Sequence, residues 1–251
     1  MDAAASFFDS HVRRDWDLKS LLNLSHLSPH VQQHLRRVYT TLCVSLVVAA
    51  VGIYAHVLTN LGGLLTSLGF IGCVMWLLST PSYEEDKRYK ILMGASFLEG
   101  LCLGPLVDLS YNVFQGDYGL VMTALLGTVA VFASFSGAAV FARRREYLFL
   151  GGILSSAVST MMMLRFGSYL FGGASAMFNL ELYGGLLLFV GYVLFDTQLI
   201  IERASKNDDD YIQHTLDLFI DFVSLFVRIL VILTKKEVES SRKEDKRKRR
   251  E

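Results

Sequence analysis

The sequence predicts an all-α membrane protein with seven membrane helices, and three observations support this fold class. Hydrophobic residues make up 52% of the 251 residues, and only three residues are proline. Seven apolar stretches of roughly 20 residues follow one another, and each is long enough to cross a bilayer as a helix. The loops between them alternate in positive charge, as loops on the two sides of a membrane do. This composition argues against a soluble enzyme.

The chain begins with a polar arm over residues 1–36, which we expect to be cytosolic. Leu18, Leu21 and Leu22 lie at helical spacing, so this arm is predicted to contain a short amphipathic helix on the membrane surface. Ser28 followed by Pro29 is typical of a helix start. We therefore expect one continuous helix from this point into the first span.

The membrane domain is predicted to cover residues 37–233, and residues 234–251 form a polybasic tail. The seven predicted spans are residues 38–58, 61–79, 91–109, 119–141, 147–164, 180–201 and 215–233. Because only a few residues separate the first two spans, we expect them to form a tight antiparallel hairpin.

Positive charges in the short loops predict the orientation of the chain. The basic residues in the loops after the second, fourth and sixth spans are Lys87, Arg88, Lys90, Arg143, Arg144, Arg145, Arg203 and Lys206. The loops on the other side contain only Arg165. The N-terminus and the basic loops are therefore predicted to be cytosolic. The basic tail does not fit this alternation, because a seventh full crossing would place it on the side opposite the basic loops. Either the last helix is re-entrant or the charge rule fails for the tail.

The last span, TLDLFIDFVSLFVRILVIL, contains charged residues at helical spacing. Asp217, Asp221, Ser224 and Arg228 form one polar stripe on an otherwise apolar helix. An ionised side chain in the middle of a bilayer costs roughly 2.5 to 3.5 kcal/mol on insertion scales. We therefore expect this helix to lie inside the protein, with its stripe facing other helices or water.

Two carboxyl groups are predicted to meet between the last two spans. Asp196 lies six residues before Glu202 and Asp221 six residues after Thr215, which places both about 9 Å from the same loop. If they face each other, they share a proton and titrate as a coupled pair. The first hypothesis is a proton-gated pathway for cations, with Ca²⁺ as the transported ion. The alternative is that the carboxyl groups only hold the helices together.

Four further residues are supporting candidates for this pathway: Asp217, Glu99, Arg228 and His214. Asp217 and Arg228 are equally suited to structural pairing, and a solvated loop position is the alternative for His214. Two carboxylates supply too few ligands for a tight metal site. The sequence shows no phosphate-binding loop, zinc signature or nucleophile elbow, so we expect no enzyme activity, no cofactor and no nucleic-acid partner.

The tail follows the last span directly and suits anionic lipid headgroups or an acidic partner such as calmodulin. Simple solvation and topology signalling is the alternative. Its basic residues are Lys235, Lys236, Arg242, Lys243, Lys246, Arg247, Lys248, Arg249 and Arg250.

Several strings resemble the Bax inhibitor-1 family, also called the transmembrane Bax-inhibitor-motif proteins, and especially its plant members. They are HLSPHVQQHLRRVYTTL, ARRREYLFLGGILSS, FDTQLIIERA, DYIQH and LDLFIDFVSLF. The resemblance implies two three-helix layers around a central C-terminal helix, in the membrane of the endoplasmic reticulum. It also implies a pH-sensitive Ca²⁺ leak that suppresses programmed cell death and modulates stress responses.

The family's pH-sensing aspartates correspond to Asp196 and Asp221, and the implied partners include calmodulin and Bcl-2-type cell-death regulators. One departure concerns the second span, which has no charge here, whereas bacterial relatives use an Arg there to latch the aspartates. The rival function is a membrane scaffold that recruits partners through its tail without conducting ions. A proton-coupled transporter is a third hypothesis.

Overall fold

The computed structural model describes residues 27–113, 116–142 and 146–248, and the regular structure in these residues is helical throughout. This confirms the predicted fold class. The predicted amphipathic helix of the N-terminal arm lies outside the described residues. The helices are α3 (Pro29–Thr59), α4 (Leu64–Ser79), α5 (Glu85–Val113), α6 (Gly119–Phe141), α7 (Leu150–Phe171), α8 (Ala174–Ala204) and α9 (Tyr211–Lys248).

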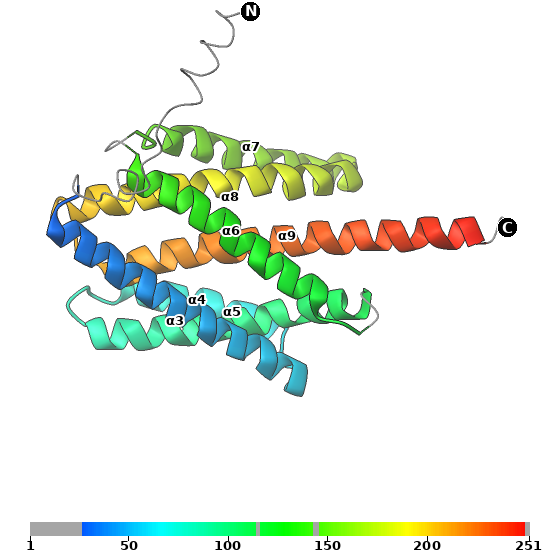
Figure 1. Ribbon diagram of the computed structural model, residues 1–251, viewed down its shortest axis with the longest axis horizontal. Helices are drawn as coiled ribbons and strands as arrows, with labels where there is room; N and C mark the ends of the chain where they lie inside the picture. Colours follow the sequence, from blue (N-terminus) through cyan, green and yellow to red (C-terminus); the bar gives the residue numbers. More distant parts are fainter. Residues whose placement is uncertain (1–26, 114–115, 143–145, 249–251) are drawn as a thin grey trace, which may run out of the picture.

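The helices form two layers with α9 between them. Helix α5 packs against both α3 and α4 on one side, and α8 packs against both α6 and α7 on the other. Helices α3 and α4 do not pack against each other, so the tight antiparallel hairpin predicted for the first two spans was wrong. Helix α9 contacts α3, α5, α6 and α8, so it touches both layers, and Figure 1 shows it running between them. A buried polar stripe is possible only on a helix surrounded in this way.

Helix α3 begins where the sequence predicts. Ser28 has an extended backbone, and its side chain accepts a hydrogen bond from the Val31 amide at 3.4 Å, with Pro29 in the first turn. The helix then continues without a break to Thr59, where Asn60 takes a left-handed conformation and ends it. The predicted continuous first helix is confirmed.

Helix α9 is continuous from Tyr211 to Lys248 and contains no reversal, so its path through the bundle is not re-entrant. Its 38 residues correspond to a length of about 57 Å. It starts at the end of the bundle where α3 starts and projects beyond the opposite end, as Figure 1 shows. Most of the tail is therefore an extension of α9, whereas the sequence suggested a separate segment after Leu233.

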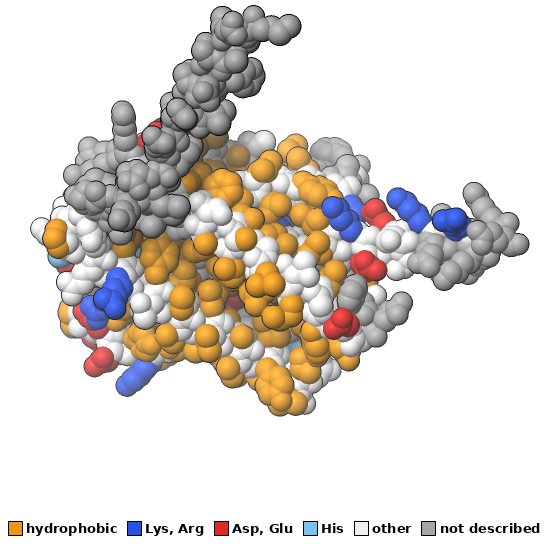
Figure 2. All heavy atoms as spheres, in the orientation of Figure 1, with side chains coloured by type: hydrophobic (Ala, Val, Ile, Leu, Met, Phe, Trp, Pro, Cys, Tyr) orange, Lys and Arg blue, Asp and Glu red, His pale blue; other side chains and the backbone are white. Residues whose placement is uncertain are grey.

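Among the described residues, five helices are long and apolar enough to cross a membrane: α3, α5, α6, α7 and α8. Helix α4 is apolar but only 16 residues long, and α9 is excluded from this group by its charges. Figure 2 shows hydrophobic side chains over the visible face of the bundle, with Lys and Arg side chains along the projecting part of α9. The protein is thus a multi-pass membrane protein.

Candidate functional site at the α8–α9 interface

The structure brings Asp196 of α8 and Asp221 of α9 together. Their side chains are in hydrogen-bond contact, and Asp221 is only 3% exposed. The Oδ2 atom of Asp221 has no hydrogen-bond partner among the described residues. Two carboxyl groups can hydrogen-bond to each other only when one of them carries a proton. The contact between Asp196 and Asp221 therefore requires a proton on one of the two carboxyl groups.

Thr197 and Gln198, the two residues that follow Asp196, attach α8 to α6. The Thr197 hydroxyl lies 3.1 Å from the hydroxyl of Ser136 on α6, which in turn contacts the hydroxyl of Tyr39 on α3. Gln198 donates to a backbone carbonyl of α6 at 3.1 Å. Residues 195–198 (FDTQ) thus attach α8 to α6 and place Asp196 on the side of α8 that faces α9. Sequence reasoning missed these roles because the partners lie about 60 residues or more away in the chain.

Two charged groups lie near the pair, toward the loop that connects α8 and α9. The charge of Asp217 on α9 interacts with the charge of Asp196. The guanidinium of Arg203, near the end of α8, interacts favourably with both carboxylates. From the sequence, Arg203 was assigned only to the topology signal. The structure also makes it part of the electrostatic environment of the site.

Glu99 is not brought to the pair. It lies on α5, half-buried, and none of the contacts of Asp196 or Asp221 involves it. In the described part of the chain its carboxyl group makes no hydrogen bond or ion pair. Glu181, at the other end of α8, forms an ion pair of 3.2 Å with Arg165.

Arg228 lies on the same stripe of α9 as Asp221 but pairs with neither Asp217 nor Asp221. Its guanidinium lies 4.3 Å from the centre of the Phe189 ring and donates to the Ser224 carbonyl at 3.0 Å. The structural pairing with Asp217 that the sequence left open is therefore not formed. The charge of Arg228 is instead held against an aromatic ring of α8.

His214 is buried, so the alternative of a solvated loop histidine was wrong. It is 1% exposed, and its Nδ1 lies 2.9 Å from Nε2 of His34 on α3. Only one of these nitrogens can carry the proton between them. If His214 donates, His34 carries its proton on Nδ1, which lies 3.8 Å from a carboxylate oxygen of Asp209. We favour this arrangement, because the opposite one buries an N–H of His214 without a partner.

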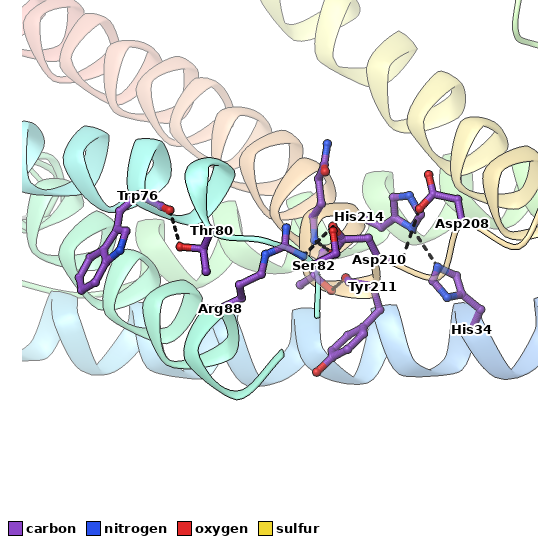
Figure 3. Close-up of polar contacts among 11 residues, drawn as sticks. His34, Trp76, Thr80, Ser82, Arg88, Asp208, Asp210, Tyr211 and His214 are labelled. Atoms are coloured by element: carbon purple, nitrogen blue, oxygen red, sulfur yellow. Dashed lines mark hydrogen bonds and ion pairs between the residues drawn. The ribbon is translucent and has the colours of Figure 1, made fainter. Parts of the chain in front are cut away.

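A second contact, between Arg88 of α5 and Asp210, fixes the start of α9. Asp210 accepts from the backbone amide of Gln213 at 3.1 Å and so caps the helix. Its other oxygen receives Arg88 at 2.6 Å and Ser82 at 3.4 Å. Figure 3 shows Ser82, Arg88 and Asp210 at the start of α9, with His34 and His214 nearby. Arg88, only 3% exposed, was assigned from sequence to the topology signal alone.

The basic residues of the tail divide into two groups. Lys235 donates to Asn179 of α8 at 2.6 Å and therefore belongs to the bundle. The exposed members are Lys236, Arg242, Lys243 and Arg247. The side chains of Lys246 and Lys248, and Arg249 and Arg250 entirely, lie outside the described part of the chain.

Fold and site together define a multi-pass helical membrane protein with an acidic pair enclosed by two layers of helices. Residues 31–238 match the family described as "Inhibitor of apoptosis-promoting Bax1". The chain is 52% identical to Bax inhibitor 1 of Arabidopsis thaliana over 95% of this chain and 96% of that one. It is 49% identical to Bax inhibitor 1 of Oryza sativa subsp. japonica, over 94% and 93% of the two chains. It is also 42% identical to Bax inhibitor 1 of Homo sapiens, over 94% and 98%. The chain belongs to the Bax inhibitor 1 family.

Proposed function

We propose that this protein suppresses programmed cell death by conducting a Ca²⁺ leak across the membrane of the endoplasmic reticulum, controlled by the protonation of Asp196 and Asp221. The names of its relatives and of the matching family support the role in cell death. The observation that carries the conducting role is the hydrogen-bond contact between two carboxyl groups of neighbouring helices, one of which, α8, is long and apolar enough to cross a membrane.

The contact between the two carboxyl groups supplies the gate. With one shared proton, the hydrogen bond holds α8 and α9 together. When that proton leaves, two adjacent negative charges repel each other in a medium of low dielectric constant. The repulsion is relieved if the helices separate or a cation enters between them, and carboxylate oxygens are the ligands that Ca²⁺ prefers. Because Thr197 and Gln198 attach α8 to α6 and Asp210 attaches the start of α9 to α5, we expect the movement to be confined to the part of the two helices around the pair.

The test is Ca²⁺ flux into liposomes that contain the purified protein, measured across a range of pH. Asp196→Asn and Asp221→Asn keep the size of each side chain but cannot lose a proton, so both variants should flatten the pH dependence. Asp86→Asn removes an exposed carboxylate from the first turn of α5 and serves as the matched control. Wild-type flux no greater than that of empty liposomes would contradict the proposal.

A second candidate function is a scaffold that recruits partners through its basic tail, and the projecting end of α9 favours it. Arg242, Lys243 and Arg247 are exposed on a helix that extends beyond the bundle. Their charge suits anionic lipid, calmodulin or an acidic surface of a Bcl-2-type regulator. Deletion of residues 240–251 tests this role and leaves the contact of Lys235 with Asn179 intact. A scaffold would lose partner binding on this deletion and show no flux in either form.

A further inference from the structure

The acidic pair and Arg228 lie along one interface between α8 and α9. On α8, Asp196, Tyr192, Phe189 and Gly185 are spaced by four, three and four residues, so they share one face of the helix. On α9, Asp221, Ser224 and Arg228 share the facing side. The rings of Phe189 and Tyr192 lie 5.8 Å apart, between the carboxyl groups and the guanidinium. A cation that leaves the pair along this interface therefore meets Arg228.

The guanidinium of Arg228 is held firmly at this place. It lies over the Phe189 ring at 4.3 Å and donates to the Ser224 carbonyl at 3.0 Å. Gly185 makes the position possible, because a Cβ atom there would lie 2.5 Å from Nε of Arg228. The absence of a side chain at residue 185 thus leaves room for a charged group at membrane depth.

The guanidinium of Arg228 forms no ion pair with any of the described residues. Its Nε is buried and has no hydrogen-bond partner there. Glu181 is the carboxylate whose charge acts on Arg228, but it already forms an ion pair of 3.2 Å with Arg165. Asp221 lies seven residues away, a rise of about 10 Å along the helix. A charge that forms no ion pair is costly inside a membrane protein, and it marks a functional position by default.

We propose that Arg228 is an electrostatic barrier in the ion path, which limits the leak and opposes divalent cations more strongly than monovalent ones. This inference rests on the proposed function, because it requires that ions pass between α8 and α9. It adds a residue that determines rate and selectivity to a pair that determines the pH response. The aspartates attract the cation, and Arg228 keeps its passage slow.

The charge of the ion provides a specific signature. The energy of an ion near a fixed charge is proportional to the charge of the ion, so the barrier for Ca²⁺ is twice the barrier for K⁺. At a separation of about 10 Å and an effective dielectric constant of about 20, removal of the fixed charge would raise passage of a monovalent cation by about tenfold. The factor for a divalent cation is the square of that value, about a hundredfold. Partial solvation reduces both factors but preserves the relation between them.

The experiment compares Arg228→Gln with Arg228→Lys, using Ca²⁺ and K⁺ flux into liposomes at one pH. Arg228→Lys retains the charge and should stay within about twofold of the wild type for both ions. Arg228→Gln should raise Ca²⁺ flux by at least about tenfold, and K⁺ flux only by about the square root of the Ca²⁺ factor. Because the guanidinium forms no ion pair in the described part of the chain, its removal should leave the protein folded, which the thermal unfolding midpoint in detergent checks. Arg228→Met repeats the test if the Gln variant does not fold.

Two kinds of failure are distinguishable. If the wild type conducts but Arg228→Gln leaves Ca²⁺ flux unchanged, the barrier is overturned and the proposed function stands. If Arg228→Gln and Arg228→Lys increase flux equally, or if both ions gain by the same factor, Arg228 acts through its bulk and the electrostatic proposal is wrong. If the wild type and all variants conduct no ions, the proposed function fails and the barrier fails with it.

Discussion

The buried contact between His34 and His214 predicts that acid weakens the attachment of α9 to α3. His214 precedes the apolar stretch 215–233, and burial, reinforced by the nearby His34, lowers its pKa from 6.5 to about 4. The folded protein therefore favours the neutral ring. As the pH falls below 6.5, a released His214 binds a proton that the packed ring does not. The stabilisation is complete above pH 6.5 and is lost progressively down to about pH 4.

The size of the effect follows from the shift in pKa. A difference of about 2.5 pH units corresponds to about 3 kcal/mol at the acid limit, and to about 2 kcal/mol at pH 5. For a chain of this size, each kcal/mol moves the unfolding temperature by roughly 2 to 4 °C. Lowering the pH from 7.5 to 5 should therefore cost about 4 to 8 °C through this residue alone. Protonation of His214 also places a second N–H group, on Nε2, at a buried position with no hydrogen-bond partner among the described residues.

The assay is thermal unfolding of the purified protein in detergent between pH 7.5 and 5. His214→Gln removes the titrating group, so on acidification its unfolding temperature should fall by about 4 to 8 °C less than that of the wild type. His30→Gln is the matched control, because His30 lies at the same end of α3 but is half-exposed, with its Nε2 atom 3.2 Å from Asp209. The reasoning is refuted if the wild type and His214→Gln lose stability in parallel across this range.

Two further predictions concern the packing that supports the site. A Cβ at Gly100 of α5 would lie 2.0 Å from the Ala49 carbonyl oxygen, so Gly100→Ala should destabilise the fold by about 1 to 3 kcal/mol or more. The control is Gly94→Ala in the same helix, where a Cβ atom would meet open space, so this variant should be neutral or stabilising by up to about 1 kcal/mol. Equal unfolding temperatures for the two variants would contradict the close contact of α3 with α5 at Gly100. Asp210→Asn should weaken the contact with Arg88 and lower the free energy of unfolding by about 2 kcal/mol. A fall in the unfolding temperature of this variant is the expected measurement.

The sequence predicted the helices and the meeting of Asp196 with Asp221 because both depend on local regularities. Hydrophobic length defines a span, and helical rise places two residues at equal distances from a shared loop at one depth. The contact of the carboxyl groups in the structure follows that arithmetic. The layer arrangement, by contrast, came from resemblance to a family and not from periodicity.

The environment of His214 could not be predicted in the same way, since its partner His34 lies 180 residues earlier in the chain. The same applies to Arg88, whose partner Asp210 is 122 residues away. Hydropathy and charge counts contain no information about such pairs. The continuation of α9 past Leu233 was missed for another reason. The polar residues that follow include many strong helix formers and no Gly or Pro, but the apolar pattern used to define the span ends there.

The most direct test of the central claim is the separation of α8 and α9 as a function of pH. Spin labels at Leu187 and Ile220, one exposed position on each helix, allow the distance to be measured by electron paramagnetic resonance in lipid nanodiscs. Loss of the shared proton should lengthen this distance as the pH rises in the wild type, and Asp196→Asn and Asp221→Asn should show no such change. A wild-type distance that stays constant over the pH range in which Ca²⁺ flux changes would contradict the account.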